Sequence, residues 1–407
     1  MAAAEVSIGM NAVRILIISD EGPQTGTAGG LLLHRLLAGH PPSCLRVLAR
    51  YVPTLGDPLP GVEYRQLTTP WMRFERSRFN RTKRSLRAWG LVPPPSMRRL
   101  DALVAGFQPE VVLCVMQHAS YYDTALRFAR SRRLPLVVIV HDVNDDFEPV
   151  LPWARAAALR RDGAFYRSAA RRLCVSPEME TYCRERYRAG GDVLYPNRGA
   201  DLKPVAFELA QRLRVPGRLT VAFAGNLAYG YGRELCRHLP ALRAAGARLV
   251  VYSRPPGADC AALGTAADCV ELRGFKPAAQ VWQEIQRDCD LVWLPYPSPA
   301  LEFERLYRYH FPSKLPEYLA LGLPVLVSGP AYATGVRWAI RHSGAVVARA
   351  DPAPEDLAAL FRELTADGES RHRLAAGGWE AGQQDFDPAR IVHDFHRHLA
   401  AAARPPP

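Results

Sequence analysis

Short apolar runs alternate with longer amphipathic stretches along most of this chain. The strand-like runs occupy residues 13–18, 45–51, 111–116, 136–140, 172–175 and 193–195, and then 219–224, 248–252, 269–272, 291–294, 324–327 and 345–347. Stretches of helical length lie between them, at 121–132, 149–170, 177–188, 278–286 and 355–365. Nearly continuous apolar strands separated by helices are typical of βαβ units, because both faces of a parallel sheet are buried. The pattern therefore predicts an α/β fold with parallel sheets.

The series of strands and helices restarts near residue 200. A turn-rich segment, Tyr-Pro-Asn-Arg-Gly-Ala-Asp at 195–201, precedes the strand-like run at 219–224. Two such units in tandem predict two Rossmann-like domains facing a central cleft, with ligands outside the carboxyl ends of the strands. We expect an N-terminal domain over 1–200 and a C-terminal domain over 201–385. The remaining residues, 386–407, are expected to form a helix that packs back toward the N-terminal domain and ends in a frayed tail.

Composition narrows the class of protein. The 407 residues are 48% hydrophobic and 23% charged, which excludes a disordered, collagen-like or disulfide-scaffold chain. The longest apolar runs, at 111–116 and 134–140, are far shorter than the ~20 residues of a membrane-spanning helix. Residues 1–12 lack the pattern of a signal peptide, and the eight cysteines include no Cys-x-x-Cys pair. These features predict a protein of the reducing cytoplasm.

The basic charge is concentrated in the first half of the chain. The formal net charge is +12; residues 1–200 hold 28 Lys and Arg against 18 Asp and Glu, and the rest hold 24 against 22. The densest part is the stretch 71–100, where Trp71, Phe74, Phe79 and Trp89 lie among nine cations, Arg73, Arg76, Arg78, Arg81, Lys83, Arg84, Arg87, Arg98 and Arg99. Such a stretch predicts peripheral binding to the anionic inner face of a membrane, or else a solvated Arg-rich helix face. No recognisable nucleic-acid-binding module accompanies the charge, so no nucleic-acid partner is expected.

Two glycine-containing loops follow strand-like runs. The first includes Gly29 and Gly30 and precedes a leucine-rich helix, and the second includes Gly225 and Asn226 after the run at 219–224. Glycines before a helix let backbone N–H groups approach an anion at the positive end of the helix. Neither loop has the GxGxxG spacing, and a flexible loop explains each of them equally well.

A further segment, His-Phe-Pro-Ser-Lys-Leu-Pro-Glu at 310–317, predicts the start of a helix. Ser313 is a good N-cap residue, and Gly322 suits the end of the helix. Lys314 at the helix start would make an anion site, and Glu317 one turn later could accept hydrogen bonds from a ribose diol. An exposed Lys–Glu pair on an ordinary helix explains the same two residues.

In these segments the chain resembles the GT-B glycosyltransferases, and most of all glycosyltransferase family 4. Four segments in the family's order carry the resemblance: Gly29-Gly30, the strand 136–140 ending in His141-Asp142, the segment 195–201, which is similar to the family's Pro-Asn-Gly-Val-Asp, and the segment 312–325. The resemblance implies a retaining, metal-independent enzyme without a cofactor, which moves a sugar from a nucleoside-diphosphate sugar to an acceptor hydroxyl. It implies that the C-terminal domain binds the donor and the N-terminal domain binds a glycan or lipid-linked acceptor.

The resemblance also implies roles for individual residues. By the family's pattern Glu317 holds the ribose, and the diphosphate lies near the Gly225 loop and the helix start at Ser313 and Lys314. The base lies near Gly274, Phe275 and Lys276. His118 and His141 each follow a strand-like run, where a histidine could hydrogen-bond the sugar or take the acceptor's proton; a histidine bonded to a backbone group explains each as well. The family places a histidine at the position of His141.

The chain departs from the family at three positions. The first glutamate of the family's pair falls on Tyr309, so the contact to the sugar hydroxyl is missing, or is supplied by Tyr309 itself or by Glu302, Glu304 or His310. The family's usual arginine and lysine after the Gly225 strand fall on Asn226 and roughly on Tyr231, so Lys314 and Arg254 are the candidates to bind the diphosphate. These departures keep two alternatives open: a sugar-nucleotide epimerase on the same fold, and a non-catalytic nucleotide-sugar-binding protein.

An acidic run follows the strand at 136–140. Its members are Asp142, Asp145, Asp146 and Glu148. Carboxylates so spaced could hold a metal ion, but a solvated acidic loop explains them as well, and we expect no metal site.

Overall fold

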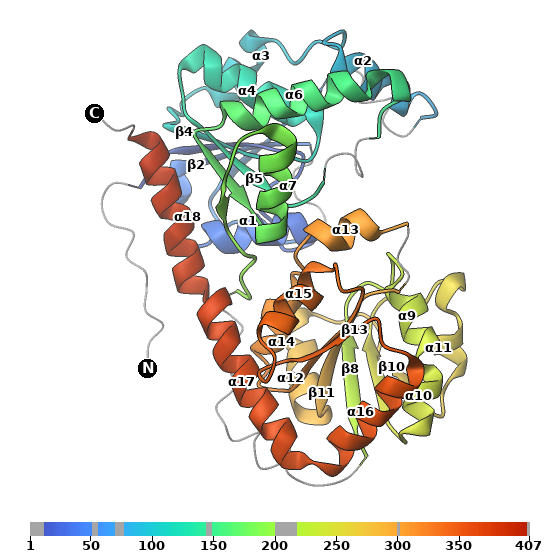
Figure 1. Ribbon diagram of the computed structural model, residues 1–407. Helices are drawn as coiled ribbons and strands as arrows, with labels where there is room; N and C mark the ends of the chain where they lie inside the picture. Colours follow the sequence, from blue (N-terminus) through green and yellow to red (C-terminus); the bar gives the residue numbers. More distant parts are fainter. Residues whose placement is uncertain are drawn as a thin grey trace. The chain divides into compact units, whose positions relative to one another are not determined.

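The computed structural model describes residues 12–50, 56–69, 77–143, 149–199, 218–298 and 302–404. The chain forms two compact units (Figure 1). The first comprises residues 1–196 together with 389–407, and the second comprises residues 197–388. The sequence placed the boundaries at 200/201 and 385/386, whereas the units divide after Pro196 and after Pro388.

The first unit is built on a parallel sheet of seven strands in the order β3-β2-β1-β4-β5-β6-β7. The strands are β1 (Ile15–Ile18), β2 (Leu45–Ala49), β3 (Glu63–Gln66), β4 (Val111–Val115), β5 (Leu136–Val140), β6 (Arg171–Cys174) and β7 (Asp192–Val193). All six pairings between neighbours are parallel. Every residue of β1, β2, β4 and β5 is buried, which is why these strands are nearly continuous apolar runs in the sequence.

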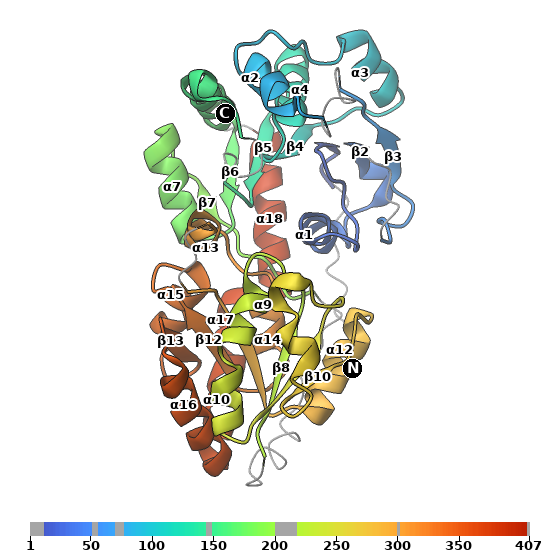
Figure 2. The same ribbon diagram turned by 90° about the vertical axis from the view of Figure 1, so that its right-hand side faces the viewer.

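Helices cover this sheet. They are α1 (Ala28–Leu37), α2 (Asn80–Ala88), α3 (Met97–Val104), α4 (Ala119–Arg132), α6 (Arg155–Ser168), α7 (Pro177–Tyr187) and α18 (Pro388–Ala403), with 3-10 turns η1 (Pro42–Cys44) and η3 (Pro152–Ala154). Although α18 ends the chain, it packs beside α1, where His396 stacks on His40 with ring centroids 5.1 Å apart (Figure 2). The first unit therefore contains both the N-terminal and the C-terminal part of the chain.

The second unit has a parallel sheet of six strands in the order β10-β9-β8-β11-β12-β13. Its strands are β8 (Thr220–Ala224), β9 (Arg248–Tyr252), β10 (Val270–Leu272), β11 (Leu291–Pro295), β12 (Val325–Gly329) and β13 (Val347–Ala350). Its helices are α9 (Tyr231–Arg237), α10 (Leu239–Ala244), α11 (Ala262–Thr265), α12 (Ala278–Asp288), α13 (Glu304–Tyr309), α14 (Lys314–Leu319), α15 (Thr334–Arg341), α16 (Pro354–Ala366) and α17 (Gly368–Phe386), with a 3-10 turn η5 (Ala258–Cys260). The core between the sheet and α9, α10 and α16 is centred on Trp293 and Phe361, whose rings meet edge to face.

The predicted α/β fold with two parallel sheets is confirmed, and the differences from the sequence analysis are local. β3 was missed because its residues, Glu-Tyr-Arg-Gln, form a half-exposed edge strand without an apolar run. The expected helix at 149–170 is the turn η3 followed by α6. Within the part of the chain that the structure describes, no helix has the length and apolar character needed to cross a membrane.

Candidate functional site

The Gly225 loop and the start of α14 meet in the second unit. Gly225 follows β8 with φ +139, and its N–H donates to the Tyr252 carbonyl at 2.9 Å. The side chain of Lys314 crosses directly over Gly225, so that a Cβ placed at Gly225 would lie 2.6 Å from Nζ and closer still to Cε. Only glycine leaves room for the lysine here. The fold thus brings together two segments that the sequence analysis assigned to the diphosphate.

Aromatic rings surround the ammonium group of Lys314. Its Nζ lies 4.7 Å from the centroid of the Phe223 ring and 4.3 Å from that of the Tyr231 ring. Burial lowers the pKa of Lys314 to about 8, while the charge of Glu317 acts in the opposite direction. At neutral pH the group is therefore mostly charged, in an environment where a second negative charge would interact with it strongly.

The helix that carries Lys314 differs from the expected one in its cap. Ser313 occupies the N-cap position of α14 as predicted, but it has helical dihedral angles (φ −59, ψ −20) and its hydroxyl makes no capping hydrogen bond. The short helix α14 is held instead by Tyr318, whose hydroxyl accepts from the Ala224 N–H at 2.9 Å and donates to the Ala224 carbonyl at 3.0 Å. These two hydrogen bonds to β8 hold Lys314 and the half-buried Glu317 beside the Gly225 loop.

The segment expected to contact the donor sugar is α13 and the residues around it. Tyr309 is the last residue of α13 and is half-buried. Of the suggested substitutes for the missing glutamate, Glu302 forms an ion pair with Arg233, and Glu304 forms one with Arg308. His310 follows the helix and is half-buried. Two of the four candidates are thus already paired with an arginine.

Asn226 and Arg254, the other residues expected near the diphosphate, face different partners. The Asn226 side chain accepts a hydrogen bond from the Ala228 N–H at 2.9 Å and so stabilises the turn of its own loop. The guanidinium of Arg254 lies 5.7 Å from the ring centroid of Phe275. Arg254 therefore belongs with the residues expected near the base.

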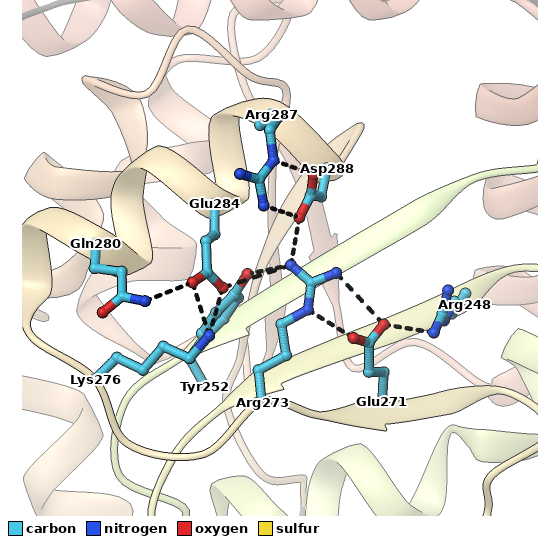
Figure 3. A network of polar contacts seen from close by, with 9 residues as sticks. All are labelled: Arg248, Tyr252, Glu271, Arg273, Lys276, Gln280, Glu284, Arg287 and Asp288. Atoms are coloured by element: carbon cyan, nitrogen blue, oxygen red, sulfur yellow. Dashed lines mark hydrogen bonds and ion pairs between the residues drawn. The ribbon is translucent and has the colours of Figure 1, made fainter.

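The loop from Arg273 to Lys276 is held at both ends by a network of charges (Figure 3). Arg273 donates to Glu271 at 2.8 Å and to the Tyr252 hydroxyl at 2.8 Å, and Lys276 donates to Glu284 at 2.7 Å. Hydrogen bonds from Arg287 and Arg273 lower the pKa of Asp288 to about 2. Between the two anchors Gly274 has φ +74, and the ring of Phe275 is 75% exposed. The network thus presents an aromatic ring to solvent on a fixed loop.

In the first unit, polar side chains gather where β1, β4 and β5 end. His118 follows β4, and its Nε2 lies 3.1 Å from Oδ2 of Asp20, the second residue after β1. His141 follows β5, and a Cβ placed at Gly29 would lie 3.9 Å from its Nδ1. The two predicted histidines therefore lie at the carboxyl ends of their strands. Asp20 was missed, although its position directly after a buried strand is a signal that could have found it.

Gly29 and Gly30 lie in the first turn of α1 itself, so the expectation of a glycine loop before the helix is wrong. The Gly30 N–H donates to the Thr27 hydroxyl, which caps α1, and a Cβ at Gly30 would lie 2.7 Å from that oxygen. The Thr27 hydroxyl in turn donates to Glu21 at 2.9 Å. Gly30 therefore has a structural reason to be glycine.

The acidic run is described only in part. Asp142 accepts a hydrogen bond from Gln117 at 3.4 Å, whereas Asp145, Asp146 and Glu148 lie outside the described residues. Among the residues that are described, no cluster of His, Cys, Asp and Glu is arranged to hold a metal ion. That the reaction needs no metal stays a prediction.

The basic stretch differs from a uniformly solvated face. Residues 71–76 lie outside the described ranges; Lys83 and Arg87 of α2 are buried, which corrects the expectation that its cations share one exposed face. The exposed residues are Arg78, Arg81, Arg98 and Arg99 together with the aromatic Phe79 and Trp89. The structure adds Trp153 and Leu159, which are exposed on η3 and α6, the elements that pack against α2.

Comparison with known proteins bears on both units. Residues 21–197 match the family model described as glycosyl transferase 4-like domain. Among curated proteins, none matches the chain in sequence.

Solved structures similar to the whole chain include HepE of Anabaena in complex with UDP and glucose (15% identity, TM-score 0.64, covering 95% of this chain and 100% of that one). Sucrose-phosphate synthase of Thermosynechococcus elongatus is similar over 95% and 99% of the two chains (15% identity, TM-score 0.66). WaaG, a glycosyltransferase involved in lipopolysaccharide biosynthesis, is similar over 94% and 98% (15% identity, TM-score 0.58). Residues 21–197 thus match a glycosyl transferase 4-like domain, and the chain as a whole has the two-unit fold of the GT-B glycosyltransferases.

Proposed function

We propose that this chain is a retaining, metal-independent glycosyltransferase, which moves a hexose from a nucleoside-diphosphate sugar to an acceptor hydroxyl. The observation that carries the proposal is the ammonium group of Lys314, which lies over Gly225 at the carboxyl end of β8. In an α/β unit this is where a ligand's phosphates are expected. Because HepE of similar fold was solved with UDP and with UDP-glucose, UDP-glucose is the first donor to test.

The proposed chemistry is charge stabilisation. As the bond from the sugar to the diphosphate breaks, negative charge grows on the leaving diphosphate, and Lys314 would stabilise that charge in a site where burial strengthens the interaction. Glu317 would accept hydrogen bonds from the ribose hydroxyls, and Phe275 with Arg254 would contact the base. In the first unit, His118 and His141 would hydrogen-bond the sugar or accept the proton of the acceptor.

An assay with a panel of nucleotide sugars tests this proposal. The purified chain is incubated with UDP-glucose and other donors, and released nucleotide, labelled product and the recovered sugar nucleotide are each measured. Transfer that is lost in Lys314→Met supports the proposal. Conversion of the donor to an epimer identifies an epimerase, and binding without turnover identifies a non-catalytic binding protein. The control is Arg243→Met, which removes one exposed cation of the second unit that is paired with Asp268.

We further propose that the acceptor is a glycan or a lipid-linked molecule at the inner face of a membrane, to which the first unit binds peripherally. A basic–aromatic patch supports this, formed by exposed Phe79, Trp89, Leu91, Trp153 and Leu159 with exposed Arg78, Arg81, Arg155 and Arg160. The guanidinium of Arg160 lies 5.7 Å from the Trp89 ring, which joins α6 to the residues that follow α2. Tryptophan beside arginine is typical of a surface at the level of lipid headgroups.

Binding to vesicles tests this second proposal. Sedimentation with anionic vesicles should be strong at low salt and weak at high salt, because each basic residue near the surface contributes ~1 kcal/mol that salt screens. Reversal of Arg78 and Arg81 to Glu should release the protein, whereas reversal of exposed Arg397 on α18 should not. A wild-type chain that ignores anionic vesicles at low salt would indicate a soluble acceptor.

A further inference from the structure

The Tyr231 ring lies against the ammonium group of Lys314. Tyr231 is the first residue of α9, and its ring centroid is 4.3 Å from the Nζ of Lys314. Its own position is fixed by aromatic neighbours, since its ring packs against those of Phe223 at 6.0 Å, Tyr296 at 6.1 Å and Tyr307 at 5.8 Å. The Tyr231 ring is therefore a fixed surface beside the flexible side chain of Lys314.

A lysine side chain has a long flexible stem, so its ammonium group needs other groups to keep it in one place. A carboxylate paired directly with it would do so but would also neutralise its charge, and Glu317 contributes a charge interaction of this kind. An aromatic face attracts the cation through its quadrupole and carries no net charge, so the full positive charge stays available to a ligand. On the opposite side, the absence of a side chain at Gly225 leaves the space in which the stem lies.

We propose that Tyr231 is a positioning residue, which holds the ammonium group of Lys314 over Gly225 for the diphosphate of the donor. This inference rests on the proposed function and deepens it. In this arrangement α14 supplies the cation, and the first residue of α9 supplies the ring that holds it. Tyr231 itself needs no contact with the ligand.

Binding measurements test the positioning role. Affinities for UDP and for uridine are measured by calorimetry in the wild type and in Tyr231→Leu and Tyr231→Phe. We expect Tyr231→Leu to weaken UDP binding by about threefold to thirtyfold and uridine binding by less than twofold, because the ring acts only through the lysine. Tyr231→Phe keeps the ring and should bind UDP like the wild type. The matched control is Tyr182→Leu, which removes a tyrosine ring 5.5 Å from the guanidinium of Arg186 in the first unit.

A double-mutant cycle separates positioning from a general structural effect. In a Lys314→Met background, Tyr231→Leu should have no further effect on UDP affinity. If the loss persists there, Tyr231 acts independently of Lys314 and the proposal is overturned. Should Tyr231→Leu fail to fold, stepwise fluorinated phenylalanines at position 231 replace it, because they weaken the ring's quadrupole at nearly constant size. UDP affinity should fall with each fluorine, and a constant affinity would overturn the proposal.

A second readout needs no ligand at all. The chain has four lysines, Lys83, Lys203, Lys276 and Lys314, so reductive methylation with 13C gives few lysine signals. The signal that disappears in Lys314→Met should be shifted upfield by the two ring faces, and Tyr231→Leu should move it downfield. An unchanged shift overturns the positioning role. If instead the wild type binds no UDP while the ring-current shift is present, the proposed function fails and the placement of Lys314 by Tyr231 stands.

Discussion

Two regions of the second unit each hold a lysine beside an aromatic ring. In one region the lysine forms an ion pair with a carboxylate, and in the other its ammonium group lies against rings. In the loop of Figure 3, Lys276 lies 5.8 Å from the Tyr252 ring and donates to both oxygens of Glu284, whose pKa it lowers. At the Gly225 loop, the ammonium group of Lys314 lies against two aromatic rings, and burial lowers its own pKa. Paired charges fix a loop, whereas a cation held by rings keeps its charge for a ligand. The comparison therefore predicts different consequences for equivalent changes in the two regions.

Removal of the lysine charge should give the largest difference. Lys314→Met should weaken UDP binding by about 100-fold and leave uridine nearly unaffected, since charge-assisted contacts to phosphate contribute about 1.5–3 kcal/mol. Lys276→Met should affect UDP and uridine to a similar extent, because it loosens the loop expected at the base. Calorimetry with both ligands measures the two ratios. Equal losses of UDP and uridine in Lys314→Met would show that Lys314 does not contact the phosphates.

Replacement of the glutamate next to Lys314 should have the second largest effect. Glu317→Gln removes the charge that would accept hydrogen bonds from the ribose, and it should weaken UDP binding by about 1–3 kcal/mol. Thermal melting should be nearly unchanged, because Glu317 is only half-buried. In the other region, Glu271→Gln breaks pairs within the network and should change the melting temperature more than the affinity. Unchanged UDP affinity in Glu317→Gln would exclude the ribose role.

Substitution of alanine for glycine should have different effects in the two loops. In Gly225→Ala the new Cβ overlaps Lys314, so the ammonium group must move and UDP binding should fall about tenfold relative to uridine binding. In Gly274→Ala nothing lies within 4 Å of the new Cβ, and the cost is the left-handed backbone at φ +74, about 1 kcal/mol of stability. Urea unfolding and calorimetry measure the two effects. A normal ratio of UDP to uridine affinity in Gly225→Ala would contradict the role of this close approach.

The pH dependence should give the smallest effect. Because the pKa of Lys314 is lowered to about 8, the free protein loses the ammonium charge as pH rises through that value. A dianionic phosphate binds the charged form, so UDP affinity should be nearly full at pH 7 and fall about eightfold between pH 7.5 and pH 9. Lys314→Arg keeps its charge over this range and should bind UDP with little pH dependence. An equally steep fall in Lys314→Arg would assign the titration to another group.

Most of the fold could be predicted from the sequence because burial leaves a local signature. Strands covered on both faces read as apolar runs, which is why Leu136–Val140 and Arg248–Tyr252 were predicted with their observed ends. The edge strand β3 carries no such run and was missed. The buried cations Lys83 and Arg87 were misjudged because α2 packs on η3 and α6, elements far from it in sequence.

For the candidate site, the sequence by itself indicated which segments are candidates, and the tertiary structure decided which side chains meet. Glycine after a buried strand and lysine at a helix start are local signals, so Gly225 and Lys314 could be found without coordinates. That Lys314 crosses Gly225 depends on how α14 is held against β8 by Tyr318, a contact between residues 94 positions apart. Packing within the second unit also placed the Tyr231 ring against the lysine, and packing within the first unit placed Asp20 beside His118. Periodic burial can be predicted from the local sequence, because it produces a regular pattern of apolar residues. The partner of a single side chain depends instead on which elements the sheet brings side by side.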